Sequence, residues 1–252
     1  MILALDVGNT HIVIGAIEEG EIRSTARIRT EPDATTAEYA IKLRDLLDYM
    51  KLDAPGLEGA IISSVVPQLV HALSKAVRDV CGCEPLVVGM DTNTGLEIAI
   101  DEQVAGDLIV GGVAVKEYYG FPAVIMDLGT ATTITTLNRN GQFAGGAILP
   151  GVQLGLKALA ENTALLPEIA ISAPKTCICE KTADCMRSGA VFGTAAMLDG
   201  MIERMQAELG GECVLVATGG LARSIVSHCR HEINCDSELL LKGLWKIYSR
   251  NR

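Results

Sequence analysis

Apolar positions along the chain follow two periods, and segments of the two kinds alternate. Near the start, three runs of apolar or alternating residues bounded by turn residues predict strands at 1–8, 12–20 and 21–30. Residues 35–52 carry Ala40, Leu43, Leu46 and Leu47 at helical spacing behind Thr35 or Thr36, which predicts an N-capped amphipathic helix. The pattern continues with a buried strand at 59–66, a helix at 67–82 and a strand at 85–89. This alternation predicts an α/β domain.

The second half of the chain has the same order of elements. We expect a helix at 106–120, three strands within 122–151, helices at 152–162 and 182–210, a strand at 213–220, and helices at 221–229 and 238–248. An Asn-Gly pair at Asn140 and Gly141 predicts the turn of the second hairpin, as Gly20 does for the first. The plan of the second half therefore matches that of the first.

The two halves also match residue by residue. Asp127 lies 121 positions after Asp6, and Gly129 and Gly141 follow Gly8 and Gly20 by the same interval. A single Asp-x-Gly is common at turns between apolar strands, because Asp forms turns and Gly tolerates positive φ. Two copies in register across a strand, a loop and a second strand indicate a duplicated domain.

The residue types in the repeated loops suit phosphate binding. Gly with small hydroxyl or amide neighbours lets backbone N–H groups approach phosphate oxygens, and the strand-end carboxylates Asp6 and Asp127 can hold a cation against them. Two such loops from homologous domains are expected to clamp one polyphosphate. A third segment, "VLVATGGLA", is an apolar strand ending in Thr218, Gly219 and Gly220, and it suits an adenosine ring lying against backbone.

Composition excludes several classes of partner. The net charge is −10 and the pI is near 4.9, so we expect no nucleic acid and no anionic membrane surface as partner, and a small molecule instead. No cleavable leader pattern and no uninterrupted apolar stretch long enough to span a membrane are found, which predicts a cytoplasmic protein. The 8 cysteines are then expected to be reduced, and their spacing does not match a zinc ribbon.

With these motifs in order, the sequence resembles the type III pantothenate kinases of the acetate kinase, sugar kinase, Hsp70 and actin superfamily. The resemblance rests on "DVGNTHIVIG", "SSVVP", "TGL", "DLGTATT", "GGAILPG" and "ATGGLA", and it runs from Met1 to about Leu244. It implies two duplicated ribonuclease H-like (actin-like ATPase) α/β domains with an interdomain nucleotide cleft, divided as residues 1–110 and 111–252. It also implies a cytoplasmic homodimer.

The resemblance further implies ATP-dependent phosphorylation of the primary hydroxyl of pantothenate to 4′-phosphopantothenate, the first step of coenzyme A biosynthesis. The implied cofactors are ATP, Mg²⁺ and a monovalent cation, K⁺ or NH₄⁺. Carried over by position, the catalytic base is Asp107 and the cations lie at Asp6 and Asp127. The implied ATP-binding residues are Asp6, Val7, Gly8, Asn9, Thr10, His11, Ile12, Val13, Thr130, Gly219 and Gly220, and the implied acceptor-binding residues are Ala105, Gly106, Asp107, Leu108 and Thr182.

The chain departs from the family pattern where the acceptor is expected. Leu108 stands in place of the family's Arg and Gly111 in place of its Asn, while "IAIDEQ" and "CEKT" replace two other customary segments. An Arg at position 108 would suit the carboxylate of an anionic acceptor, and Lys116 and Arg187 are candidate substitutes. Without the resemblance, Asp107 would be interpreted as a carboxylate favoured by a helix N-terminus.

Three hypotheses follow. The chain is a type III pantothenate kinase with a remodelled acceptor pocket, a kinase of the same fold for another small hydroxyl acceptor, or a nucleotide-binding regulatory homologue with little turnover. Retention of Asp107 favours an enzyme, because a binding module has no evident need of that carboxylate. The stretch 188–201, rich in small and apolar residues, is either a buried core helix or a partner face.

Overall fold

The computed structural model describes residues 1–89 and 91–252, which form two compact units. The N-terminal unit comprises Met1–Leu96, Glu102–Ala114 and Glu238–Arg252, and the C-terminal unit comprises Glu97–Asp101 and Val115–Ser237. The division drawn from the sequence at residues 110 and 111 leaves the last helix with the second domain. In the structure that helix packs within the N-terminal unit.

The N-terminal unit contains a five-stranded mixed sheet in the order β3-β2-β1-β4-β5. Its strands are β1 (Ile2–Val7), β2 (His11–Glu18), β3 (Glu21–Arg29), β4 (Gly59–Ser64) and β5 (Leu86–Val87). The first three strands are antiparallel neighbours, whereas β4 is parallel to both β1 and β5. A two-residue turn joins β2 to β3, and both Glu19 and Gly20 have positive φ there, as the right-handed strand twist favours.

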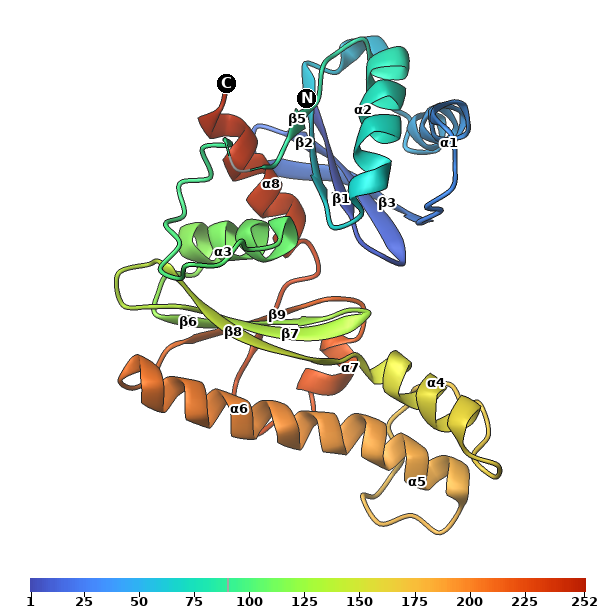
Figure 1. The fold of residues 1–252 in the computed structure, drawn as a ribbon, viewed down its shortest axis with the longest axis vertical. Helices are drawn as coiled ribbons and strands as arrows, with labels where there is room; N and C mark the ends of the chain where they lie inside the picture. Colours follow the sequence, from blue (N-terminus) through green and yellow to red (C-terminus); the bar gives the residue numbers. More distant parts are fainter. Residues whose placement is uncertain (90) are drawn as a thin grey trace. The chain divides into compact units, whose positions relative to one another are not determined.

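Helices cover both faces of this sheet (Figure 1). On one face, α1 (Thr36–Tyr49) and α2 (Pro67–Cys81) pack over a core that includes Leu3, Leu5 and Ile62. Thr35, one of the two predicted N-cap residues, caps α1 and forms a capping box with Glu38. A short 3₁₀ turn, η1 (Ala54–Gly56), precedes β4.

The other face of the sheet meets α8 (Leu239–Arg250), which in turn packs on α3 (Gly106–Tyr118). Glycines make this packing close. A Cβ at Gly15 would collide with Leu241, one at Gly59 with Tyr248, and one at Gly243 with the carbonyl oxygen of Val110. These contacts join residues far apart in the sequence, and they explain why the last helix belongs to the N-terminal unit.

The C-terminal unit repeats the sheet, in the order β10-β9-β6-β7-β8. Its strands are β6 (Ala123–Leu128), β7 (Ala131–Leu137), β8 (Phe143–Pro150), β9 (Val214–Thr218) and β10 (Asn234–Cys235). β6 is antiparallel to β7 and parallel to β9, as β1 is to β2 and β4. The identical strand order in the two units confirms the duplication.

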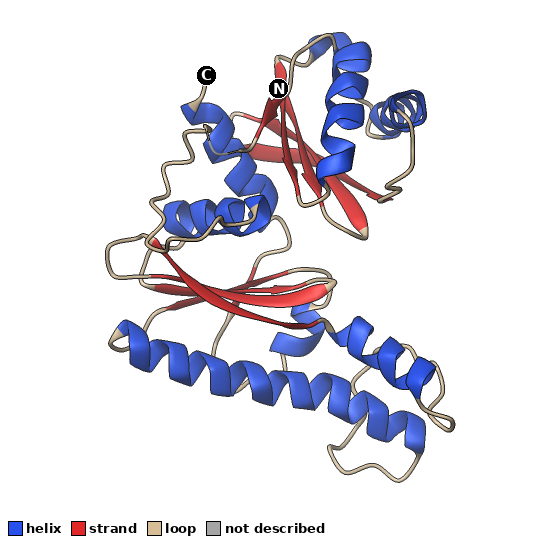
Figure 2. Cartoon of the chain, viewed as in Figure 1, coloured by secondary structure: helices blue, strands red, loops and turns tan. Residues whose placement is uncertain are grey.

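Helices of the C-terminal unit are α4 (Val152–Asn162), α5 (Thr182–Ser188), α6 (Thr194–Leu209) and α7 (Ala222–Val226). A π-helical turn, η2 (Gly189–Gly193), joins α5 to α6, so the single helix predicted at 182–210 is continuous but bulged (Figure 2). Val191, Ala195 and Leu198 lie in the core of the same unit. One face of the stretch 188–201 therefore lies in the core, while Gly189, Gly193 and Ala196 are exposed.

The structure corrects three local expectations. The helix expected at 221–229 is limited to Ala222–Val226, and β10 was not anticipated because two residues carry no periodic signal. The Asn-Gly turn belongs to a three-residue loop, which is closed by Asn138 N donating to Gln142 O at 2.9 Å. The Asn138 side chain accepts from Asn140 N and Gln142 N in the same loop.

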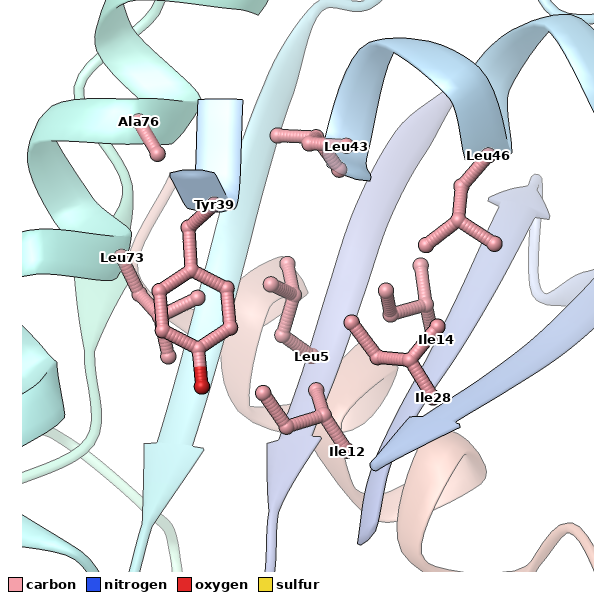
Figure 3. A pocket seen from close by; sticks show the side chains of 9 residues that line it. All are labelled: Leu5, Ile12, Ile14, Ile28, Tyr39, Leu43, Leu46, Leu73 and Ala76. Carbon is pink, nitrogen blue, oxygen red and sulfur yellow. The ribbon is translucent and has the colours of Figure 1, made fainter. Parts of the chain in front are cut away.

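The core of the N-terminal unit contains a small hollow between α1, α2 and the sheet (Figure 3). Its lining is apolar apart from the Tyr39 hydroxyl, which donates to Glu31 O at 3.0 Å. A hollow of this kind leaves no polar group to orient a ligand, so it is a packing defect rather than a site. Within the described residues, no helix is long and apolar enough to cross a membrane.

Candidate active site

The first hairpin loop, Gly8–His11, joins β1 to β2 and is held from the side by Thr30. Gly8 N donates to His11 O at 3.0 Å and closes the loop. Thr30 Oγ1 donates to Gly8 O at 2.7 Å, and Thr30 N donates to Thr10 O at 3.0 Å. Because Thr30 is buried at the end of β3, these two bonds fix both sides of the loop.

The segment Asp6–Val13 divides into residues that face solvent and residues that face the core. Val7 and Ile12 are buried in the hydrophobic core, so their side chains are not available to a ligand. Asn9, Thr10 and His11 are exposed at the tip. Any ligand bound at the tip therefore meets backbone and these three side chains, with the half-buried Asp6 at the base of the loop.

Asp6 lies on the face of the sheet opposite α1 and α2, next to a buried serine. In the parallel pairing of β1 with β4, Asp6 is level with Ser63. The Ser63 side chain is 0% exposed, and a Cβ at Gly106 would lie 3.1 Å from its Oγ. The first turn of α3, which carries Asp107, is thus placed over Ser63 and beside the end of β1 that carries Asp6.

Asp107 is half-buried in the first turn of α3. One of its carboxylate oxygens, Oδ1, accepts from Leu108 N at 2.9 Å. Burial raises the pKa of the Asp107 carboxyl, and the hydrogen bond from Leu108 N opposes the shift only in part. A raised pKa makes the ionised carboxylate a stronger base.

The residues around Asp107 include two of the departures from the family pattern, Leu108 and Gly111. Ala105 is exposed, and its carbonyl oxygen accepts from Ile109 N at 3.2 Å. Leu108 is half-buried and supplies no charge. Gly111 is buried, and the Leu240 Cδ2 atom of α8 lies 3.5 Å from where a Cβ would be. A larger side chain at position 111 would thus meet Leu240.

The second hairpin loop, Gly129–Ala131, joins β6 to β7 and is one residue shorter than the first. Gly129 N donates to Ala131 O at 3.1 Å. A Cβ at Gly151 would collide with the carbonyl oxygens of Gly129 and Thr130, so only a glycine fits against this loop. Thr130 is exposed at the tip.

Gly219 closes the other side of the same site. It has φ +94°, and a Cβ there would collide with Asp127 Oδ1 and with the backbone of Leu128. Asp127 is half-buried on β6, level with Thr133 on β7 and Thr218 on β9. The loop after β9 therefore lies directly on the carboxylate at the end of β6.

Thr182 begins α5 in the C-terminal unit, and its side chain is exposed. In the next turn, Arg187 Nη1 lies 2.8 Å from Asp184 Oδ1 and forms an ion pair with it. The Arg187 Nε atom donates to Ala170 O at 3.3 Å. Arg187, a candidate substitute for the missing family Arg, is therefore already paired with a carboxylate.

The predicted residues are divided between the two units. Asp6, the loop Gly8–His11 and the segment Ala105–Leu108 belong to the N-terminal unit, whereas Asp127, Thr130, Gly219, Gly220 and Thr182 belong to the C-terminal unit. Among the described residues, no three His, Cys, Asp or Glu side chains form a cluster that could hold a metal by themselves. A cation at Asp6 or Asp127 would therefore need ligands from the nucleotide, from water or from backbone.

Sequence reasoning missed three residues of these groups: Thr30, Ser63 and Gly151. Thr30 and Gly151 act on loops more than 20 residues away in the sequence. Ser63 and Gly151 lie in the quoted segments "SSVVP" and "GGAILPG", but no local rule assigns them a contact.

Comparison with known proteins identifies similar sequences over the whole chain. The family model for type III pantothenate kinase matches residues 2–204. A type III pantothenate kinase of Moorella thermoacetica is 40% identical over 257 residues, and one of Halalkalibacterium halodurans is 38% identical over 253 residues. Each alignment covers 100% of this chain and 100% of the relative.

Solved structures are similar in fold. The inorganic polyphosphate/ATP-glucomannokinase of Arthrobacter sp. strain KM aligns with a TM-score of 0.53 at 13% identity, covering 99% of this chain and 98% of that one. The activator of 2-hydroxyisocaproyl-CoA dehydratase from Clostridium difficile has the same TM-score and identity, with 99% and 94% covered. This likeness confirms the predicted fold class, two duplicated ribonuclease H-like α/β domains.

Proposed function

The chain belongs to the type III pantothenate kinase family, and from this premise we propose that it transfers the γ-phosphoryl group of ATP to the primary hydroxyl of pantothenate. The product is 4′-phosphopantothenate, and the reaction is the first step of coenzyme A biosynthesis. The observation that carries the proposal is the position of Asp107, whose half-buried carboxylate lies in the α3 turn that packs on Ser63, level with Asp6.

ATP binds at the glycine-rich loops. The loop Gly8–His11 and the loop Gly129–Ala131 both present exposed polar tips at the ends of strands, which suits phosphate oxygens. Gly219 and Gly220 expose backbone between β9 and α7, where an adenosine ring can lie without meeting a side chain at those two positions.

Asp6 fits a divalent cation. Its carboxylate is half-buried at a strand end, and the neighbouring Ser63 hydroxyl is a further oxygen on the same face of the sheet. Mg²⁺ binds through one or two carboxylates together with phosphate oxygens and several waters, so one Asp is sufficient from the protein. When bound, Mg²⁺ neutralises charge that develops on the phosphate oxygens.

Asp107 acts as general base toward the acceptor. Its carboxylate accepts the proton of the primary hydroxyl as the oxygen attacks the γ-phosphorus. Burial raises the pKa of Asp107, which makes its carboxylate a stronger base.

A monovalent cation, K⁺ or NH₄⁺, is proposed at Asp127. The carboxylate there is flanked by the hydroxyl-bearing residues Thr133 and Thr218 and is covered by Gly219. Hard cations of this kind take oxygen ligands, which hydroxyls, carbonyls and a carboxylate supply. Replacing K⁺ by Na⁺ in the assay is expected to lower turnover, whereas equal turnover in the two salts would refute this site.

A second acceptor class is favoured by one observation. Leu108 supplies no cation for the carboxylate of pantothenate, and the Arg187 guanidinium is paired with Asp184. We therefore propose comparing kcat/KM for pantothenate with that for pantothenol, in which a hydroxyl replaces the carboxylate. A higher kcat/KM for pantothenol would indicate that the acceptor is neutral.

Association into a homodimer is proposed from exposed apolar side chains in the C-terminal unit. Those side chains are Ile148, Leu154, Leu159, Leu165 and Ile178. Thr182 lies in the same part of the sequence and is expected at the partner's acceptor site. Leu154→Glu on α4 should shift sedimentation toward monomer, whereas Ile41→Glu on α1, also an exposed apolar position but in the other unit, should not.

The direct test of the function is an ATP-consumption assay with and without pantothenate, with the product identified by mass. Pantothenate-dependent ADP formation with a phosphorylated product is expected. ATP binding without a phosphorylated product would leave only the nucleotide-binding role.

A further inference from the structure

Ser63 has a buried hydroxyl that makes no hydrogen bond to any residue the structure describes. Its side chain is 0% exposed, and its Oγ atom has no hydrogen-bond partner among the described residues. The next residue on β4 behaves differently, since Ser64 Oγ donates to Val66 O at 3.1 Å and accepts from Val66 N at 3.0 Å. Leaving a buried hydroxyl unsatisfied costs stability, so an alanine at position 63 would suit the fold alone better.

The position of this hydroxyl is the important feature. Ser63 is level with Asp6 in the parallel pairing of β4 with β1, and their side chains point to the same face of the sheet. On that face the first turn of α3 lies over the serine, because a Cβ at Gly106 would be 3.1 Å from Ser63 Oγ. The unsatisfied oxygen is thus placed between the carboxylate assigned to the metal and the helix turn that carries Asp107.

We propose that Ser63 is a positioning residue of the phosphoryl-transfer site, and that its hydroxyl takes its hydrogen-bond partner from a water molecule of the divalent cation at Asp6. The inference rests on the proposed function, since it needs a metal–nucleotide complex to supply that water. Mg²⁺ keeps several of its waters when it is bound by one carboxylate and phosphates. Such a water is a strong donor, and Ser63 Oγ has two lone pairs to accept it.

Chemistry favours water over a phosphate oxygen as the partner. To meet a fully buried side chain beneath α3, any partner must displace the α3 turn, and a single water needs a smaller displacement than a bulky phosphate. The bond would fix the orientation of the metal shell relative to Asp107. Deleting the hydroxyl should therefore affect ligands that contain the metal and spare ATP alone.

The test compares Ser63→Ala with Ser74→Ala by thermal unfolding. Ser74 lies on α2, on the opposite side of the sheet, and its hydroxyl is also buried and without a described partner. Each variant and the wild type are measured without ligand, with ATP and a chelator, and with Mg²⁺–ATP. Isothermal titration gives the dissociation constants of metal-free ATP and of Mg²⁺–ATP.

Without ligand, both variants should melt at or above the wild-type temperature, because each loses an unsatisfied hydroxyl. With ATP and chelator, both should bind like the wild type. With Mg²⁺–ATP, Ser63→Ala should bind about three- to tenfold more weakly and show a smaller thermal shift, whereas Ser74→Ala should match the wild type.

Two outcomes would overturn the inference. An unchanged Mg²⁺–ATP affinity in Ser63→Ala would show that the hydroxyl has no part in the metal complex. A melting temperature below that of the wild type without ligand would show that it has a structural partner. If the wild type itself fails to bind Mg²⁺–ATP, the proposed function fails first, and that result is distinguishable because it appears without any substitution.

Discussion

The loop Gly8–His11 is held in place by a side chain, whereas the loop Gly129–Ala131 is held by glycine backbone. Thr30 bonds to the first loop at two points, and Gly151 lies against the carbonyl oxygens of the second. The two loops begin from the same strand position, after Asp6 and Asp127, but the second is one residue shorter. Duplication has preserved the hairpin and changed the way it is supported.

A second difference lies at the strand parallel to each hairpin. Ser63 on β4 is level with Asp6, and Thr218 on β9 is level with Asp127. After β9 the chain continues with Gly219 at φ +94°, which lies on the carboxylate. After β4 it continues with Val65 and Val66 and reaches Pro67, the first residue of α2. Among the described residues, the C-terminal unit thus has glycine backbone after its parallel strand, whereas the N-terminal unit has the first turn of α3, which carries the proposed base, beside its carboxylate.

The largest expected effect comes from removing the base that distinguishes the N-terminal unit. Asp107→Asn should lower kcat about 10²- to 10⁴-fold, the usual contribution of general base catalysis. ATP affinity should stay within a factor of about two, because neither loop is altered. Rate measurements paired with nucleotide titration check this. Wild-type turnover by Asp107→Asn would exclude Asp107 as the base.

The same substitution should also stabilise the fold at neutral pH. Burial raises the pKa of Asp107, so the folded chain holds the proton more tightly than the unfolded chain does. The resulting stability is fully present below the ordinary pKa of Asp and is lost as the pH rises through the raised value. Asp107→Asn should therefore melt above the wild type at pH 7 and near it in acid, while Asp101→Asn, at an exposed carboxylate, should show no such difference.

An intermediate effect is expected where the chain departs from its family. Leu108→Arg should improve pantothenate affinity by about ten- to a hundred-and-fifty-fold, since a charged hydrogen bond contributes about 1.5–3 kcal/mol. Leu108→Lys should recover less, because an ammonium group lacks the bidentate fork of arginine. KM for pantothenate and for pantothenol, measured in each variant, shows whether the gain depends on the carboxylate of the acceptor. No gain with Arg would argue against a carboxylate partner at position 108.

The turn that lies on Asp127 in the C-terminal unit is tested by Gly219→Ala. Positive φ and the collision with Asp127 should together cost roughly 1–3 kcal/mol and weaken ATP binding about five- to a hundred-and-fifty-fold. Gly200→Ala in α6, where a Cβ meets open space, should instead stabilise the fold by about 0.5–1 kcal/mol. Equal ATP affinity in Gly219→Ala and the wild type would contradict the role assigned to this turn.

The smallest effect is expected from the side-chain support of the N-terminal unit. Thr30→Val removes the 2.7 Å bond to Gly8 O and keeps the shape of the side chain, so ATP affinity should fall about two- to tenfold. Thr25→Val, at an exposed position on the same strand, should leave it unchanged. A loss equal in the two variants would show that the strand, and not the bond, matters.

The sequence was sufficient to predict long elements with a clear hydrophobic period and residues in repeated motifs. Both hairpins and the N-cap of α1 came from such signals. It did not predict β10, which has two residues, or the π turn η2. Ser63 and Thr30 act through contacts between strands that are distant in the chain, and Gly243 assigns α8 to the N-terminal unit by touching Val110. Local sequence patterns do not predict such contacts.

The central claim is that both duplicated loops bind the phosphates of ATP. Hydrogen exchange of the backbone amides, followed with and without Mg²⁺–ATP, tests it most directly, because protected amides identify the binding segments. The nucleotide should slow exchange in Gly8–His11 and in Gly129–Ala131 together, and leave the exposed turn at Glu19 and Gly20 unchanged. Protection confined to one of the two loops would contradict the claim.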